Sequence, residues 1–406
     1  MARARIGVWF VGAKGGVAST AIVGLIALRK GLIGSAGLTS ELPRFAAIDL
    51  AAWKDFVAIG GHEIRDVRSY DEAALMCSQS HAIDGELLAK CKSEIDRVDR
   101  QIKPGTILNV GQTIAELAGT EIRKRQETPR EAIDRLQADL KAFAAEHKLS
   151  HTIVVNVSST EPPCDTSAIP AKWSELEKLI DKPRKCALPA SSLYAIAALD
   201  LGCSFLNFTP SLAATPPAID ELARLRGARH MGYDGKTGET LLKSVLAPMF
   251  AKRNLPVMSW VGHNIFGNMD GKVLDNPENK RAKVTSKDRL LGQILGYAPQ
   301  TLVSIEYIES MRDWKTAWDH IHFQGFLGLP MTFQFIWQGC DSVLAAPLVL
   351  DLVRFTERAW RAGDTGTLSF LSCFFKSPLG VTEHDFGLQF QMLEQWCEKL
   401  TTRESR

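Results

Sequence analysis

The sequence predicts an α/β protein with buried parallel strands, and three observations support this prediction. Residues 6–11 (IGVWFV) form a short, continuously apolar run, typical of a strand buried in a parallel sheet. A Gly-rich turn, GAKGGVAST, follows at once, and Ser19 opens an apolar helix that ends at Gly31. A further apolar run, residues 151–157, leads into the polar segment SSTEPP, and ligands of open α/β sheets bind at strand carboxyl ends.

Length, composition and cysteine spacing narrow the class of protein. The chain has 406 residues, enough for two domains, with 23% charged and 45% hydrophobic residues. Its net charge of +2, with basic and acidic residues interspersed, argues against a dedicated nucleic-acid binder. No apolar run approaches the roughly 18 residues of a membrane span. Eight cysteines without CxxC spacing are typical of reduced thiols, so we expect a soluble intracellular protein.

The Gly-rich turn between the first strand and helix predicts a phosphate cradle, because unpaired N–H groups and the helix dipole point at it. The dinucleotide fingerprint GxGxxG is matched by Gly12 and Gly15 but not by Lys14 and Ala18. The alternative, a P-loop of partition-type ATPases, lacks the lysine directly before Ser19 and is one residue too short. We favour a dinucleotide; a purely structural turn is the third interpretation.

The other elements follow in chain order. Residues 55–64 read as a strand and turn, where Glu63 is either the acid that hydrogen-bonds an adenosine ribose or a surface turn acid. Thr128, Pro129 and Glu131 form an N-cap, an N1 proline and a capping-box acid, which predict an amphipathic helix. Further helices are expected over 191–202, 241–250 and 340–355, and strand patterns over 203–208, 302–309 and 331–339.

The stretch from 259 to 287 has the composition of an anion site. Gly267, Asn268 and Asp270 lie in a tight turn that leaves backbone N–H groups pointing outward. Lys283 and Lys287 follow, four apart, so a helix would project both ammonium groups from one face. A solvated basic face is the alternative interpretation.

Other charged residues lie further along the chain. A second Gly-rich loop, GYDGKTGET, holds Asp234 and Lys236, and Asp313 precedes Lys315. Lys376 stands alone in an apolar segment, where a charge is costly without a partner or a task. His320 and His322 share one strand face, but with no third ligand nearby we expect a solvated strand and no metal.

Seven segments, in order and spacing, resemble the myo-inositol-1-phosphate synthase family, compact prokaryotic type. They are GAKGGVAST, DGKTGET, GNMDGKVL, the pair Lys283 and Lys287, Asp313 with Lys315, DSVLAAPL and LSCFFKSPL. The chain departs from the family pattern in the first turn, where Lys14, Gly16, Val17 and Ala18 replace glycine and asparagine residues. TEPP also lacks the family's arginine.

The resemblance implies a doubly wound Rossmann NAD-binding domain with an inserted α+β catalytic and tetramerisation domain. The first would span residues 1–240, completed by 341–406, and the second residues 241–340. It implies NAD-dependent cyclisation of D-glucose 6-phosphate to 1L-myo-inositol 1-phosphate by oxidation at C5, enolisation, aldol closure and re-reduction. It also implies NAD as cofactor, a cytoplasmic homotetramer, and no nucleic-acid or membrane partner. Alternatives are a sibling cyclase acting on another hexose phosphate, such as fructose 6-phosphate, and a non-catalytic NAD-binding protein.

The resemblance also implies the site residues. The catalytic set is Lys283, Lys287, Lys315 and Lys376, with Lys283 and Lys376 at the sugar oxygens and the other two nearer the phosphate. The substrate set is Lys236, Thr237, Gly238, Asn268, Asp270 and Leu274. The NAD set is Gly12, Ala13, Lys14, Gly15, Gly16, Val17, Ser19, Thr20, Glu63, Ser158, Ser159, Thr160, Asp234, Asp313, Asp341 and Ser342.

Overall fold

A seven-stranded parallel sheet forms the larger part of the molecule. The computed structural model describes residues 4–182, 185–274 and 290–404. The strand order is β11-β6-β5-β4-β1-β2-β3, and every neighbouring pair is parallel. The strands are β1 (Ile6–Val11), β2 (Phe56–Glu63), β3 (Ile102–Pro104), β4 (His151–Asn156), β5 (Ser204–Asn207), β6 (Arg229–Gly232) and β11 (Gly366–Thr367). The order reverses between β1 and β4, which is the switch point of a doubly wound sheet.

Helices cover both faces of this sheet, as the apolar strands require. Residues of β1 alternate between the two cores: Val8 and Phe10 pack in one, Trp9 and Val11 in the other. The first core includes α1 (Gly16–Arg29), α2 (Ser69–Ser80), α3 (Gly85–Gln101) and α13 (Asp341–Arg361). The second includes α4 (Gln112–Ala115), α6 (Pro129–Glu146), α7 (Trp173–Ile180), α8 (Ala190–Asp200) and α9 (Pro217–Leu225). The predicted doubly wound α/β fold is therefore confirmed.

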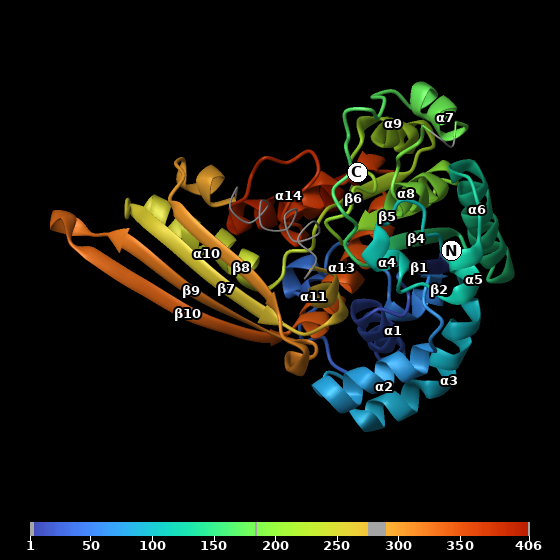
Figure 1. The fold of residues 1–406 in the computed structure, drawn as a ribbon, viewed down its shortest axis with the longest axis horizontal. Coiled ribbons are helices and arrows are strands. Elements are labelled where there is room, and N and C mark those ends of the chain that lie inside the picture. Colours follow the sequence, from blue (N-terminus) through green and yellow to red (C-terminus); the bar gives the residue numbers. More distant parts are fainter. Residues whose placement is uncertain (1–3, 183–184, 275–289, 405–406) are drawn as a thin grey trace.

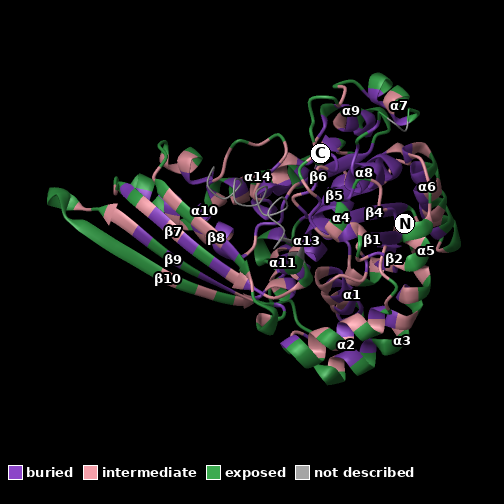
Figure 2. Ribbon diagram, viewed as in Figure 1, coloured by how far each residue is buried: buried purple, intermediate pink, exposed green. Residues whose placement is uncertain are grey.

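A separate four-stranded sheet extends from the main body as a long wing (Figure 1). Its order is β10-β9-β7-β8, with β7 and β8 parallel and the other pairs antiparallel. The strands are β7 (Val257–Phe266), β8 (Gln300–Tyr307), β9 (Trp314–Gln324) and β10 (Pro330–Cys340). Helix α10 (Gly238–Lys252) packs on one face through Ala247 and Phe250. Figure 2 shows β10 mostly exposed along its length.

The remaining elements are short, apart from the last helix. They are α5 (Thr120–Lys124), α11 (Met269–Leu274), α14 (Phe386–Glu404) and the 3₁₀ turns η1 (Thr39–Glu41), η2 (Pro43–Phe45), η3 (Trp53–Asp55), η4 (Glu309–Met311), η5 (Phe326–Gly328) and η6 (Ser369–Phe374). None of the helices within the described residues is long and apolar enough to cross a membrane.

Candidate active site

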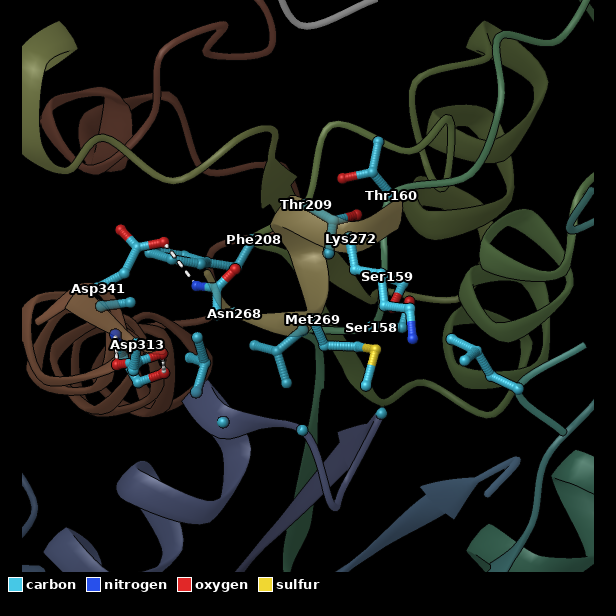
Figure 3. Close-up of a pocket in the computed structure, with 18 of the residues that line it drawn as sticks. Ser158, Ser159, Thr160, Phe208, Thr209, Asn268, Met269, Lys272, Asp313 and Asp341 are labelled. Carbon is cyan, nitrogen blue, oxygen red and sulfur yellow. Dashed lines mark hydrogen bonds between the residues drawn. The ribbon is translucent and has the colours of Figure 1, made fainter. Parts of the chain in front are cut away.

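A cavity of about 480 Å³ lies over the carboxyl ends of the central strands. Gly12 after β1, Glu63 at the end of β2 and Ser158 after β4 all line it. It continues to the base of the wing, where Asn268 and Asp341 lie (Figure 3). The cavity thus occupies the switch point, where doubly wound sheets bind their ligands, and also touches the second sheet.

The Gly-rich turn brings its backbone close to Ser158 and Ser342, with no space for a side chain at Gly12 or Gly16. Gly12 has φ +80°, and a Cβ there would lie 2.7 Å from the Cα of Ser158. A Cβ on Gly16 would lie 2.7 Å from the hydroxyl of Ser342. Gly16 also begins α1, and the first N–H groups of a helix have no partner within it. These residues fit the pyrophosphate of a dinucleotide, since backbone N–H groups and the helix dipole both favour an anion there.

Lys14 turns away from this cradle. Its ammonium lies 2.5 Å from the carbonyl oxygen of Val67 and 3.3 Å from Oδ1 of Asp99. A P-loop requires a lysine that reaches the phosphates, so the geometry argues against the ATPase interpretation. The structure also places other residues of the predicted NAD set outside the cavity lining: Ala13 and Ser19 are buried, and the hydroxyl of Thr20 donates to the carbonyl of Gly16.

Glu63 lies where the ribose acid was expected, at the end of β2, and its carboxylate is held by backbone N–H groups. Oε2 accepts from Lys14 at 2.8 Å, and Oε1 accepts from Ile64 at 2.8 Å and from Arg65 at 3.0 Å. The guanidinium of Arg65 donates to Glu72 at 3.0 Å. Arg65 and Glu72 line the cavity and were not predicted from the sequence.

Ser158, Ser159 and Thr160 line the cavity after β4 (Figure 3). The hydroxyl of Ser158 donates to Oδ1 of Asn156 at 2.7 Å, which fixes its orientation. The neighbouring Glu161, also missed in the sequence, accepts a bond from the amide of Ser191 at 2.9 Å. Burial raises the pKa of Glu161 to about 7.

Asp313 joins the base of β9 to the start of α13. Its carboxylate accepts from the amide and hydroxyl of Ser342, both at 2.8 Å, and from the thiol of Cys340 at 2.9 Å. Burial raises the pKa of Asp313. The amide of Asp313 donates to the hydroxyl of Ser80 at 3.3 Å, so α2 is tied to the same point. Asp313 therefore holds together three segments that line the cavity.

Two predicted lysines converge on this end of the cavity, each beside a carboxylate. Lys376 lies 2.7 Å from Oδ1 of Asp234, and both are buried to about nine-tenths or more. Lys315 lies 3.9 Å from Oδ1 of Asp341 and 4.7 Å from the centre of the Phe266 ring. Oδ2 of Asp234 is buried and has no hydrogen-bond partner among the described residues. That oxygen is available to a ligand hydroxyl.

Two residues of the predicted substrate set, Asn268 and Thr237, line the cavity. The amide of Asn268 donates to Oδ2 of Asp341 at 3.3 Å, and its Oδ1 accepts from the amide of Gly271 at 3.0 Å. Gly238, with φ +53°, begins α10 directly after Thr237. The loop therefore presents helix N-terminal N–H groups beside Lys376.

The position of Lys236 corrects the prediction that it lines the substrate site. Its side chain is 2% exposed and donates to Oε1 of Gln389 in α14, away from the lining of the cavity. Burial lowers the pKa of Lys236 to about 8. The alternation of the loop sends Asp234 and Thr237 to the cavity and Lys236 to the opposite side, so Lys236 anchors the C-terminal helix.

Lys283 and Lys287 lie outside the described residues, and Asp270 and Leu274 belong to α11 without described side chains. His320 and His322 lie on β9. Within the described part of the chain, no group of three or more His, Cys, Asp or Glu side chains is arranged to hold a metal ion.

Glu239 and Lys243, one turn apart in α10, were also missed. They form an ion pair of 2.6 Å with both side chains 1% exposed. The sequence signal that could have identified them is the spacing of four residues between a glutamate and a lysine in an expected helix. The cavity thus combines a phosphate cradle with ammonium groups held by carboxylates, which suits chemistry on an oxygen-rich anion next to a dinucleotide.

Comparison with known proteins agrees with this geometry. The family model described as myo-inositol-1-phosphate synthase, an NAD-binding family, matches residues 6–398. Inositol-3-phosphate synthase 1 of Bacteroides thetaiotaomicron is 34% identical over 97% of this chain and 95% of its own. The match to the rat protein of the same name, at 31% identity, covers 62% of this chain and 48% of that protein.

Solved structures resemble the whole chain. Inositol-3-phosphate synthase of Caenorhabditis elegans has a TM-score of 0.86 at 24% identity, covering 98% of this chain and 86% of that one. A myo-inositol-1-phosphate synthase-related protein of Thermotoga maritima has a TM-score of 0.77 at 25% identity, covering 97% and 98%.

Proposed function

The chain belongs to the myo-inositol-1-phosphate synthase family, and from this membership we propose that it converts D-glucose 6-phosphate into 1L-myo-inositol 1-phosphate. The observation that carries the proposal is the convergence of Lys376 with Asp234 and Lys315 with Asp341 beside the Gly-rich cradle. NAD, when bound, would supply reversible hydride transfer at C5. Gly12, Gly15, Gly16 and the side chains of Ser158 to Thr160 would hold it.

The lysines suit the charge that this reaction creates. Oxidation at C5, enolisation and aldol closure each develop negative charge on a sugar oxygen. Lys376, buried beside Asp234, donates hydrogen bonds in a site of low dielectric, where they stabilise such charge most. The ammonium of Lys376, paired with the Asp234 carboxylate, is also the group that would give a proton to a sugar oxygen or take one from the sugar. Lys315, Thr237 and Asn268 are assigned to the phosphate end, together with Lys283 and Lys287, whose roles rest on the resemblance.

The cavity spans two parts of the chain, in keeping with a domain built by insertion. We assign NAD binding to residues 1–240 and 341–406, and catalysis and assembly to residues 241–340. The open face of the wing is the surface we assign to a homotetramer. The eight cysteines are free thiols, which agrees with a cytoplasmic protein.

Product analysis tests the function directly. The purified protein is incubated with glucose 6-phosphate and catalytic NAD⁺, and the phosphorylated product is identified by NMR. Inositol 1-phosphate without net NADH is the expected result. NAD binding with unchanged glucose 6-phosphate would exclude this substrate, and fructose 6-phosphate is then the next substrate to assay. NAD binding without turnover of any hexose phosphate would favour a non-catalytic NAD-binding protein.

A further inference from the structure

A second, small cavity lies behind the two described lysines of the site. Its volume is about 10 Å³, and Lys315, Lys376, Thr237, Thr240, Glu239 and Asn264 line it. A space of this size holds about one water molecule when enough polar groups surround it. The lining supplies ammonium and hydroxyl donors as well as carboxylate and amide oxygens. The small cavity therefore lies between the catalytic lysines and a polar cluster beneath them.

That cluster is deeply buried and fixed in place. The carboxylate of Glu239 lies 2.6 Å from the ammonium of Lys243 and accepts from the amide of Asn264 at 2.6 Å. Oδ1 of Asn264 is buried and has no hydrogen-bond partner within the described ranges. A Cβ at Gly262 would lie 2.5 Å from Oε1 of Glu239, so the strand backbone closes against the carboxylate. Asp319, which accepts from Trp260 at 2.7 Å, is the other charged group facing Gly262.

Stability alone does not account for such a pair. Burying two charges costs several kcal/mol, and apolar side chains of similar volume often stabilise as well or better. The pair lies in the helix that starts at the substrate loop, and Glu239 shares the small cavity with Lys315 and Lys376. Asn264, whose Oδ1 has no hydrogen-bond partner within the described ranges, is a lining residue of the same cavity. These observations point to a task at the site.

We propose that Glu239 is a positioning residue of the reaction, acting through one water molecule in the small cavity that bridges its carboxylate to Lys376 and Lys315. Lys243 and Asn264 hold the carboxylate in place. The three lysines Lys243, Lys315 and Lys376 are each matched by a carboxylate, of Glu239, Asp341 and Asp234. The water directs the ammonium of Lys376 toward the sugar oxygens and that of Lys315 toward the phosphate end. This inference rests on the proposed function.

The test replaces both charges at once, because Glu239→Gln alone would leave Lys243 buried without its counter-charge. The double variant Glu239→Gln, Lys243→Gln keeps hydrogen-bonding groups on both side chains. We expect kcat with glucose 6-phosphate to fall about 10- to 100-fold, while KM and the NAD⁺ dissociation constant change little, because orientation and not binding is lost. The control is Glu357→Gln, Arg361→Gln, which removes another pair at i and i+4, 2.7 Å apart, in α13, where the Glu357 side chain is 2% and the Arg361 side chain 27% exposed.

The second readout does not depend on turnover. Acetylation of Lys376 by limiting acetic anhydride, followed by mass spectrometry, should be at least about threefold faster in the double variant. Glu239 lines the small cavity with Lys376 and Lys243 does not, so the nearer charge lost is the carboxylate, and a less stabilised ammonium is more often the free amine. A variant that does not fold is replaced by Glu239→Asp, which keeps the charge but shortens its reach and should show the same loss of kcat. Wild-type-like kcat and acetylation in a folded variant would overturn the inference. Inactive wild type would instead overturn the proposed function.

Discussion

Lys376 and Asp234 are joined twice, although 142 residues separate them. The ammonium lies 2.7 Å from Oδ1, and the amide of Lys376 donates to the carbonyl of Asp234, also at 2.7 Å. An antiparallel bridge between Gly235 and Phe375 runs alongside. The backbone bonds therefore keep the two segments side by side, which places the Lys376 ammonium within reach of the Asp234 carboxylate.

The first prediction is that Lys376→Gln abolishes most turnover while the protein stays folded. Glutamine retains a donor for Asp234 but removes the proton that the lysine holds, so kcat should fall by at least about 100-fold. Lys252→Gln is the matched control, because Lys252 pairs with Asp385 at the same 2.7 Å but is 67% exposed. Steady-state kinetics of both variants decide the matter. A kcat of Lys376→Gln within tenfold of wild type would remove Lys376 from the chemistry.

The second prediction separates the two interpretations of the Gly-rich turn. Lys14→Gln should leave the NAD⁺ dissociation constant nearly unchanged, because its ammonium contacts Val67 and Asp99 and not the cradle. Gly12→Ala should weaken binding strongly, because its Cβ would lie 2.7 Å from Ser158 and the residue has φ +80°. Calorimetric titration with NAD⁺ and with ATP gives both answers. ATP binding that is lost in Lys14→Gln would restore the P-loop hypothesis.

The third prediction concerns pH and Lys236. Burial lowers the pKa of Lys236 to about 8, from an ordinary value of 10.5. The charged form therefore costs stability below pH 8, and this cost falls as the pH rises from about 8 to 10.5, because the native lysine loses its proton first. Lys236→Met removes the charge, and also the bond to Gln389.

Lys236→Met should accordingly have a higher free energy of unfolding at pH 7, by roughly 1–3 kcal/mol, with the gain shrinking toward pH 10. Urea unfolding at pH 7 and pH 9.5 measures both values. Lys252→Gln, in which an exposed lysine is replaced, should show no such trend. A difference that is the same at both pH values would mean that Lys236 is not the titrating group.

The sequence predicts local structure well where the signal is local. Residues 6–11 form β1, and Thr128 caps α6: its hydroxyl accepts from the amide of Glu131 at 3.3 Å, while that side chain accepts from Thr128 at 2.7 Å. The periodicity of 340–355 likewise predicts most of α13. These features depend on neighbouring residues alone.

Side-chain direction within irregular loops was not predictable, because it depends on tertiary contacts. Lys236 stands in a Gly-rich loop and Lys376 in an apolar segment, and neither context shows that the first faces Gln389 and the second Asp234. Glu239 and Lys243 were not identified from the sequence, since their burial depends on Asn264 and Gly262 of the wing. The order of the motifs along the chain therefore identified the segments of the site, whereas tertiary packing decides which of their side chains face the cavity.

The last prediction concerns assembly through the open face of the wing. Ile336 of β10 lies opposite Trp318 of β9, and the two are 69% and 40% exposed. Leu302 of β8 is 54% exposed, and lies opposite Val261 of β7. Alternate residues such as Trp260 and Ile321 are completely buried against the helix side. A solvated sheet face would normally carry polar residues, so exposed apolar ones there indicate a partner.

Ile336→Lys combined with Trp318→Lys should therefore lower the oligomeric state, because charged side chains would lose hydration in a sheet-to-sheet contact. Light scattering coupled to size-exclusion chromatography measures the mass. Leu225→Lys is the control: Leu225 is 63% exposed, but on α9, in the other part of the molecule, and its replacement should leave the mass unchanged. An unaltered tetramer in the wing variant would move the interface elsewhere, and a monomeric wild type would remove assembly from the proposal.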